Sequence, residues 1–167
     1  MNKRDFDNAR VWRLGADVDT DALAPGAYMK HGLEVIGWHC LEAVRSDFAS
    51  GVREGDVIVA GANFGIGSSR EQAAGVLRHL GLAAVIAPSY SGLYFRNAFN
   101  LGLLLLTCPE ADKIEEGERM GVTFEGDKPW VIRANGQRLA CAAIPEFLMD
   151  MVDAGGLLPL LKQRKPA

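Results

Sequence analysis

The sequence predicts an α/β fold with a parallel βαβαβ core and β-rich flanks. Three short apolar runs support this, at Asp56–Ala60, Ala83–Ala87 and Leu103–Leu106. Two segments with the apolar spacing of helices separate the runs, and the connections are short. Strands that alternate with helices in this way form a parallel sheet with right-handed crossovers.

The N-terminal part is less regular. Residues Arg10–Leu14 are predicted to form a short strand, followed by the turn-prone stretch GADVDTDALAPG at Gly15–Gly26. Residues Leu33–Val44 are predicted to be helical. The stretch DFASGVREGD, Asp47–Asp56, is interpreted as a polar surface connection.

In the middle of the chain each apolar run is a candidate buried strand, because it is short and aliphatic. The first helix is predicted over Ser69–His79, with Gly81 as its stop. The second helix is predicted within Ser91–Gly102, where apolar side chains recur at helical spacing, namely Leu93, Tyr94, Ala98 and Leu101.

After Pro109 the pattern changes. GVTFEG and WVIRANGQRLACAAI, residues 121–126 and 130–144, are predicted to be antiparallel strands with Asn135–Gly136 as a hairpin turn. PEFLMDMVDAGG, residues 145–156, is predicted to be a helix that ends at glycine. KQRKPA, residues 162–167, is interpreted as a solvated tail.

Length and composition predict one domain over residues 1–167, with its motifs in about 10–110 and the C-terminal hairpin and helix in about 120–160. The chain is 49% apolar and 23% charged, with a net charge of −3. This lack of basic excess argues against nucleic-acid binding. There is no run long enough to cross a membrane, and the N-terminus lacks the apolar core of a secretion signal. We therefore expect a cytoplasmic protein.

Candidate metal ligands are few. Cys40, Cys108 and Cys141 are scattered without a CxxC pair, so we interpret them as reduced and structural, and expect no metal in this chain. Asp17, Asp19 and Asp21 alternate as in a calcium loop. The glycine and distal glutamate of an EF-hand are missing, which argues against calcium.

The stretch GANFGIGSSREQ, Gly61–Gln72, carries the strongest chemical signal. It lacks the third glycine of a dinucleotide fingerprint, the lysine of a phosphate loop and the second glycine of a hydrolase elbow. Ser68 and Glu71 match a helix capping box, which is one interpretation. The other is an anion site, since glycines, two hydroxyls, a helix N-terminus and the Arg70 guanidinium suit a carboxylate or phosphate.

Three segments resemble the small subunit of 3-isopropylmalate dehydratase, which is equivalent to the swivel domain of aconitases. They are DVDTDALAPGAYM, GANFGIGSSREQA and AAVIAPSYSGLYFRNAFNLGLLLL, which occur in the family's order over residues 10–110. The resemblance implies a swivelling β/β/α fold and a hydro-lyase that moves water between neighbouring carbons of a 2-hydroxy di- or tricarboxylate. It also implies a 4Fe–4S cluster on a separate large subunit, with this chain as half of a two-chain enzyme.

Site residues carry over at matching positions. Ser68 aligns with the family's catalytic base, whereas Ser69 and Arg70 align with residues that hold a substrate carboxylate. Asp21, with Thr20, matches an acidic active-site position, although Asp21 could also cap a turn. Asn63 is expected to fix the loop, with substrate contact as the alternative.

Substrate choice stays open. Gln72 and Ile66 replace a usual histidine and a frequent cysteine of the family pattern. The residue after Tyr28-Met29 faces the variable substrate group in the family, and here it is Lys30. Lys30 could bind a third carboxylate, as in a homoaconitase-like enzyme, or it could be solvated. The default substrate is 3-isopropylmalate, of leucine biosynthesis; citramalate, methylcitrate or dimethylmalate types are alternatives, as is a non-catalytic carboxylate-binding or structural subunit.

Overall fold

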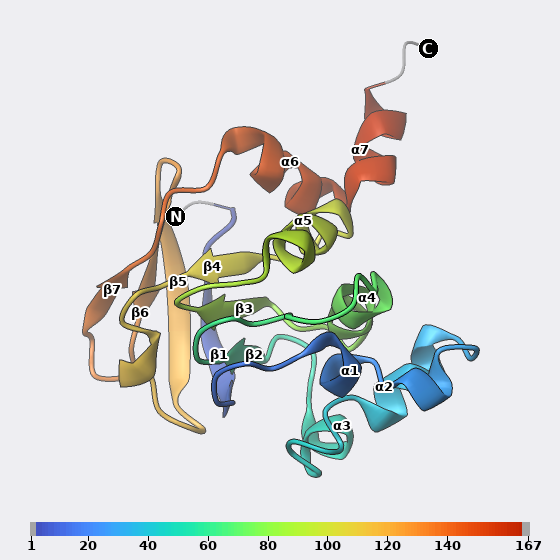
Figure 1. Cartoon of the computed structure of the whole chain (residues 1–167). Coiled ribbons are helices and arrows are strands. Elements are labelled where there is room, and N and C mark those ends of the chain that lie inside the picture. The colour runs from blue at the N-terminus through green and yellow to red at the C-terminus, as the bar shows by residue number, and fades with distance from the viewer. Residues whose placement is uncertain (1–2, 165–167) are drawn as a thin grey trace.

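The computed structural model describes residues 3–164 and places their strands in one seven-stranded sheet of order β4-β3-β2-β1-β5-β6-β7. Figure 1 shows the helices on one side of the molecule and the antiparallel strands on the other. The strands are β1 (Phe6–Arg13), β2 (Val57–Val59), β3 (Ala84–Ala87), β4 (Leu105–Thr107), β5 (Arg119–Glu125), β6 (Lys128–Ile132) and β7 (Arg138–Ala140).

Strands β1 to β4 are mutually parallel, which confirms the predicted parallel core. Val57 of β2 pairs with Val11 of β1 on one side and with Ala84 of β3 on the other. All residues of β2 and β3 are buried, as expected for strands covered on both faces. The predicted strand at Arg10–Leu14 is the second half of a longer β1, which begins at Phe6 and occupies the centre of the sheet.

The antiparallel flank is also confirmed. Strand β1 pairs with β5 across a bulge between Phe6 and Ala9, where Asn8 has a left-handed φ of 56°. Strands β5, β6 and β7 then form successive antiparallel pairs. The loop from β6 to β7 contains Asn135 and Gly136, and the Arg133 amide donates to the Gln137 carbonyl at 2.8 Å to close it.

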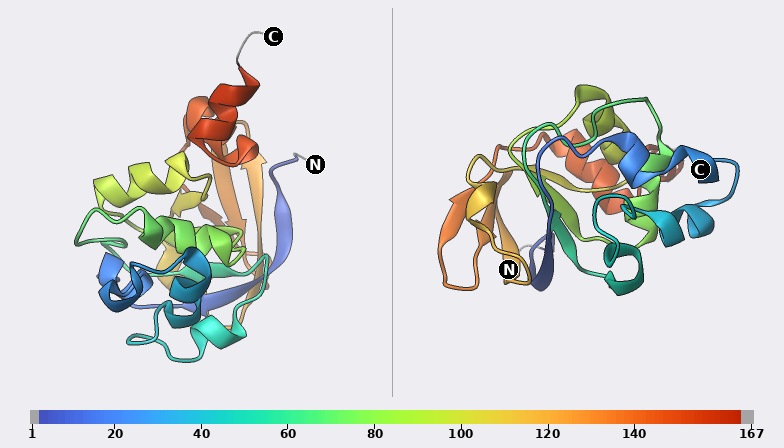
Figure 2. Two further views of the ribbon diagram at one scale, coloured as in Figure 1. Left: turned by 90° about the vertical axis from the view of Figure 1, so that its right-hand side faces the viewer. Right: turned by 60° about the horizontal axis from the view of Figure 1, so that its bottom comes forward.

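Helices connect the parallel strands, and two more helices form the C-terminal part of the described chain (Figures 1 and 2). No helix within residues 3–164 is long and apolar enough to cross a membrane. The helical elements are α1 (Thr20–Leu23), η1 (Gly26–Tyr28), α2 (Leu33–His39), α3 (Phe48–Gly51), α4 (Gln72–His79), α5 (Gly92–Asn100), η2 (Ala111–Lys113), α6 (Glu146–Ala154) and α7 (Leu157–Gln163).

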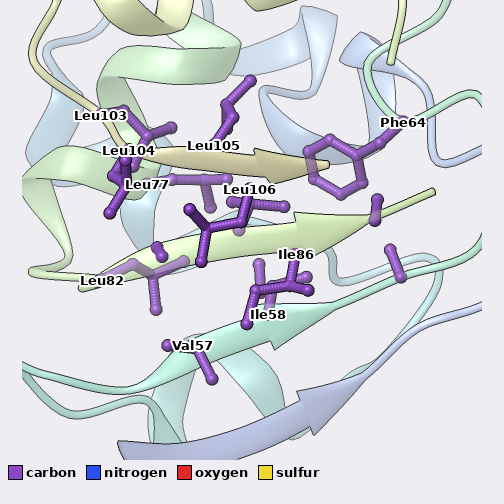
Figure 3. Packing of buried hydrophobic residues seen from close by; sticks show 14 of the residues in the cluster. Val57, Ile58, Phe64, Leu77, Leu82, Ile86, Leu103, Leu104, Leu105 and Leu106 are labelled. Carbon is purple, nitrogen blue, oxygen red and sulfur yellow. The ribbon is translucent and has the colours of Figure 1, made fainter. Parts of the chain in front are cut away.

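One hydrophobic cluster joins the sheet to its helices. In Figure 3, Leu77 of α4 lies close to Leu104 and Leu106, and Phe64 lies at the end of β4. Phe64 and Leu77 are both fully buried. Because Phe64 belongs to the loop between β2 and α4, the core anchors that loop directly.

Some predicted elements differ from the structure. The helix predicted to reach Val44 ends at His39, because Leu41 takes a left-handed φ of 62°. The stretch Asp47–Asp56 is no purely polar connection, since it contains α3, and Phe48 is fully buried against Trp12 with their ring centroids 5.2 Å apart.

At the C-terminus, helix α6 ends at Gly155, which has a left-handed φ of 89°, as predicted. Lys162 and Gln163, expected in a solvated tail, instead belong to α7. Residues 165–167 of that tail lie outside the described part of the chain.

Asp56 is expected to be a main polar determinant of stability. Its buried carboxylate accepts hydrogen bonds from the Arg10 guanidinium at 2.8 Å, the Trp12 indole at 2.9 Å and the Arg53 amide at 2.9 Å. Asp56→Ala would leave these donors without their acceptor, and should lower the free energy of unfolding by roughly 3 kcal/mol in urea denaturation. An unchanged unfolding midpoint would contradict this.

The contribution of the Asp56 carboxylate to the stability of the fold depends on pH. Burial alone would raise the pKa of Asp56, but the three donors outweigh burial and lower it. Its contribution is therefore complete above the unfolded-state pKa of about 4 and is lost as the pH falls through the lower folded-state value. The difference in stability between the wild type and Asp56→Ala should accordingly shrink only in that acidic range.

Candidate active site

The loop from β2 to α4 depends on two glycines. Gly65 and Gly67 have left-handed φ values of 85° and 105°. A Cβ on Gly65 would lie 2.2 Å from the ring of Tyr94, and one on Gly67 would lie 3.1 Å from Thr20 Oγ1. Glycine is therefore needed both for the backbone conformation and for the close packing.

Backbone hydrogen bonds hold this loop between two other segments. The Gly65 amide donates to the Val18 carbonyl at 2.7 Å, and the Thr20 amide donates to the Ile66 carbonyl at 2.8 Å. On the other side, the Ser91 amide donates to the Phe64 carbonyl at 2.9 Å. The loops that follow β1, β2 and β3 thus meet at the carboxyl ends of parallel strands, where ligands of α/β sheets commonly bind.

Ser68 and Ser69 lie exposed at the end of this loop. Within residues 3–164 neither hydroxyl has a hydrogen-bond partner, and the amides of Ser69, Glu71 and Gln72 have no acceptor. Hydroxyls and free amides at the N-terminus of an eight-residue helix form a group of unused donors that suits an anion.

The predicted helix start at Ser69 is wrong by three residues. The Arg70 amide donates to the Ser68 carbonyl at 2.9 Å in a tight turn, and α4 begins only at Gln72. Glu71 occupies the N-cap position without a side-chain capping bond, so the capping box of Ser68 and Glu71 does not form.

Arg70 is joined to Asp21 across 49 residues of sequence. Its Nη1 donates to Asp21 Oδ1 at 2.8 Å and to the Ala24 carbonyl at 3.1 Å. Asp21 Oδ1 also accepts from the Gly26 amide at 3.0 Å. The Arg70 guanidinium, followed by the Gly26 amide, lowers the pKa of Asp21, so the carboxylate is ionised and holds the guanidinium beside the serines.

The structure brings some of the predicted site residues together and leaves others apart. Thr20, Ser68, Ser69 and Arg70 line one small hollow, and Asp21 reaches it through Arg70. Asn63 instead donates to Asp17 Oδ1 at 2.9 Å outside the lining.

Lys30 also lies outside that lining, exposed on the segment that follows η1. Its ammonium has no hydrogen bond or ion pair within the described residues.

Helix α5 supplies lining residues that were not singled out as site residues from the sequence. Ser91 and Asn97 line the hollow, together with Leu93 and Tyr94. The Tyr94 hydroxyl donates to the Ala73 carbonyl at 3.0 Å and so ties α5 to α4. The signal in the sequence that could have identified these residues is the presence of polar side chains in a mostly apolar helix. Asn97 lies in the segment AAVIAPSYSGLYFRNAFNLGLLLL, which carries the family resemblance.

The side chains of residues 3–164 offer no ligand set for a metal or an iron–sulfur cluster. Asp19 caps α1 through the Ala22 amide at 2.7 Å, so the three alternating aspartates have separate structural partners. No group of three or more His, Cys, Asp or Glu side chains within residues 3–164 could hold a metal ion. The cysteines are free and buried. Burial raises the pKa of the Cys40 thiol, whereas a hydrogen bond with Cys141 lowers the pKa of Cys108.

A comparison with known domain families gives the structural class of this chain. A family model described as the aconitase C-terminal domain matches residues 46–111, which include β2, the Ser68 loop, α4, β3, α5 and β4. The chain has the mixed α/β fold of this domain, also called the swivel domain, with parallel core strands and an antiparallel flank.

Comparisons over the whole chain narrow the class to a family. The 3-isopropylmalate dehydratase small subunit 1 of Archaeoglobus fulgidus is 41% identical over 154 residues, 92% of this chain and 95% of that protein. The isopropylmalate/citramalate isomerase small subunit of Methanocaldococcus jannaschii is 38% identical over 163 residues, 96% of each chain. A crystal structure of 3-isopropylmalate dehydratase from the latter organism superposes with a TM-score of 0.87 at 35% identity, covering 96% of this chain and 95% of that one.

The chain therefore belongs to the family of 3-isopropylmalate dehydratase small subunits. It is a subunit of a hydro-lyase of the isopropylmalate dehydratase/isomerase type.

Proposed function

We propose that this chain is the small subunit of a two-chain hydro-lyase that isomerises 3-isopropylmalate in leucine biosynthesis. The observation that carries the proposal is the set of unused donors at Ser68, Ser69 and the start of α4, beside the Arg70 guanidinium. These groups match a carboxylate, which each substrate of this enzyme class contains. The names of the relatives favour isopropylmalate, with citramalate as the second candidate.

In this proposal, Arg70 and Ser69 bind a substrate carboxylate, and Ser68 removes the proton from the carbon next to the hydroxyl-bearing carbon. A serine hydroxyl is a weak base, so its oxyanion needs the free amides of α4 and the Arg70 charge beside it. The C–H proton passes to Ser68 Oγ as the double bond forms, and the hydroxyl leaves the neighbouring carbon as hydroxide, which a Lewis acid on the partner subunit would accept. On rehydration the proton returns to the carbon that lost the hydroxide, and hydroxide adds to the carbon that lost the proton.

A large partner subunit completes the site. The hollow at Ser68 holds only about 10 Å³, whereas pockets for small molecules typically enclose about 300 Å³ or more. An open half-site of this kind needs a second surface to exclude water. Since the cysteines do not fit a cluster, we place the 4Fe–4S group on that partner, and we place the complex in the cytoplasm, where three free thiols stay reduced.

Reconstitution with a large subunit of the family tests the function. The mixture is expected to turn over isopropylmalate with a higher kcat/KM than citramalate or homocitrate. A higher kcat/KM for citramalate or homocitrate would mean that this acid, and not isopropylmalate, is the preferred substrate. No turnover of any of the three acids would overturn the proposed function.

Lys30→Ala tests the role of Lys30 in substrate choice. With its ammonium exposed and unpaired, we expect Lys30 to remain in solvent, and the variant to leave the isopropylmalate-to-homocitrate ratio of kcat/KM unchanged within about twofold. A charged hydrogen bond to a third carboxylate would instead change that ratio roughly 10- to 150-fold. Such a change would make Lys30 a substrate-binding residue and favour a homoaconitase-like activity.

A further inference from the structure

Residues 21–26 bind the Arg70 guanidinium, and a side-chain contact away from the serine loop helps to fix their position. Arg70 bonds to Asp21 and to the Ala24 carbonyl, and Gly26 donates to Asp21. A Cβ on Gly26 would lie 3.6 Å from Arg70 Nη2, so the guanidinium lies beside this glycine and leaves little room for a side chain there. The position of residues 21–26 therefore sets the position of Arg70.

Local turns connect Gly26 to Tyr28. The Tyr28 amide donates to the Pro25 carbonyl at 3.0 Å, and the Met29 amide donates to the Gly26 carbonyl at 3.3 Å. These bonds stay within the turn. The Tyr28 ring attaches the turn to α2 by stacking on the His39 ring, with centroids 3.7 Å apart and planes 7° apart, and Tyr28 and Met29 also pack against the core.

His39 is itself fixed in place. It lies in the last turn of α2, and its Nδ1 donates to Glu42 Oε2 at 2.8 Å. Helix α2 packs closely on α4, because a Cβ on Gly37 would lie 3.3 Å from the Leu80 side chain. A path of packed groups thus runs from α4 through α2, His39 and Tyr28 to the segment that holds Arg70.

Resting on the proposed function, we propose that His39 is a positioning residue, which acts through Tyr28 and Gly26 to hold Arg70 ready for the substrate carboxylate. His39→Ala should then raise the KM for isopropylmalate about three- to tenfold in the reconstituted enzyme, the factor typical of a lost aromatic pair. Its kcat should stay within about twofold, because Ser68 is unchanged. His39→Phe keeps a flat ring for Tyr28 and should restore the wild-type KM.

An unchanged KM in His39→Ala, or a loss that His39→Phe does not restore, would overturn the proposal. A second readout needs neither activity nor a partner, namely the rate of trypsin cleavage after Lys30 in the full chain, followed by mass spectrometry. His39→Ala should speed this cleavage about three- to tenfold. His39→Phe and Trp38→Ala, which removes an exposed ring from the same helix, should not change it.

The two readouts separate the two hypotheses. If the reconstituted wild type is inactive but His39→Ala speeds cleavage, the proposed function fails and the anchoring of residues 26–30 by His39 stands. If His39→Ala leaves the cleavage rate unchanged, the positioning role is wrong, whatever the enzyme turns over.

Discussion

Ser68→Ala is expected to slow turnover of the reconstituted enzyme at least about 100-fold, the effect typical of a lost acid–base group. The loss should be in kcat, because in the proposed site Ser69 and Arg70 would still bind the carboxylate. Stability should hardly change, since Ser68 is exposed, its hydroxyl has no hydrogen-bond partner within residues 3–164 and it does not cap α4. Exposed substitutions of this kind usually change stability by about 0.5 kcal/mol or less.

The measurement is kcat by steady-state kinetics together with a thermal unfolding curve. Ser46→Ala, at an exposed serine outside the loop, is the matched control and should behave as wild type in both. A near-normal kcat in Ser68→Ala would rule out Ser68 as the base. A large fall in unfolding temperature would instead show a structural role.

Arg70→Gln is expected to lower kcat/KM for isopropylmalate roughly 10- to 150-fold, the value of a charged hydrogen bond. Arg70→Lys should rescue little, because an ammonium keeps the charge but cannot offer two parallel N–H groups to a carboxylate. Full activity in Arg70→Lys would show that only the positive charge is needed. It would contradict the proposal that two parallel N–H groups of Arg70 bind the carboxylate.

The same variant gives a test that needs no partner. In the wild type the Arg70 guanidinium lowers the pKa of Asp21, so Arg70→Gln should raise that pKa toward its ordinary value. An NMR titration of the Asp21 carboxyl carbon measures this directly. An Asp21 pKa that does not move would mean that the ion pair is not formed in solution.

The core was predictable because its signals are local. Asp56–Ala60, Ala83–Ala87 and Leu103–Leu106 are short aliphatic runs, and their length and the turn signals beside them identify them as strands. Phe48 was not recognised as a core residue, because a single aromatic in a polar stretch has no periodicity. The early start of β1 at Phe6 was missed because a bulge interrupts its alternation.

The site was predictable in its parts but not in its assembly. The letters around Ser68 left capping and anion binding open, and they do not show the tight turn from Ser68 to Arg70, after which α4 starts too late for the capping box. The Asp21–Arg70 pair and the Tyr28–His39 stack join residues that no spacing rule connects. Such contacts are set by tertiary packing, which a single sequence does not display.

We propose that this chain provides one half of an active site whose other half lies on an iron–sulfur partner. The most direct test is to titrate a fixed amount of large subunit with this chain and to measure isopropylmalate turnover. We expect no turnover and no iron–sulfur absorbance for this chain alone, and activity that rises with added chain and then saturates. Turnover by this chain alone, or by the large subunit alone at the full rate, would contradict it.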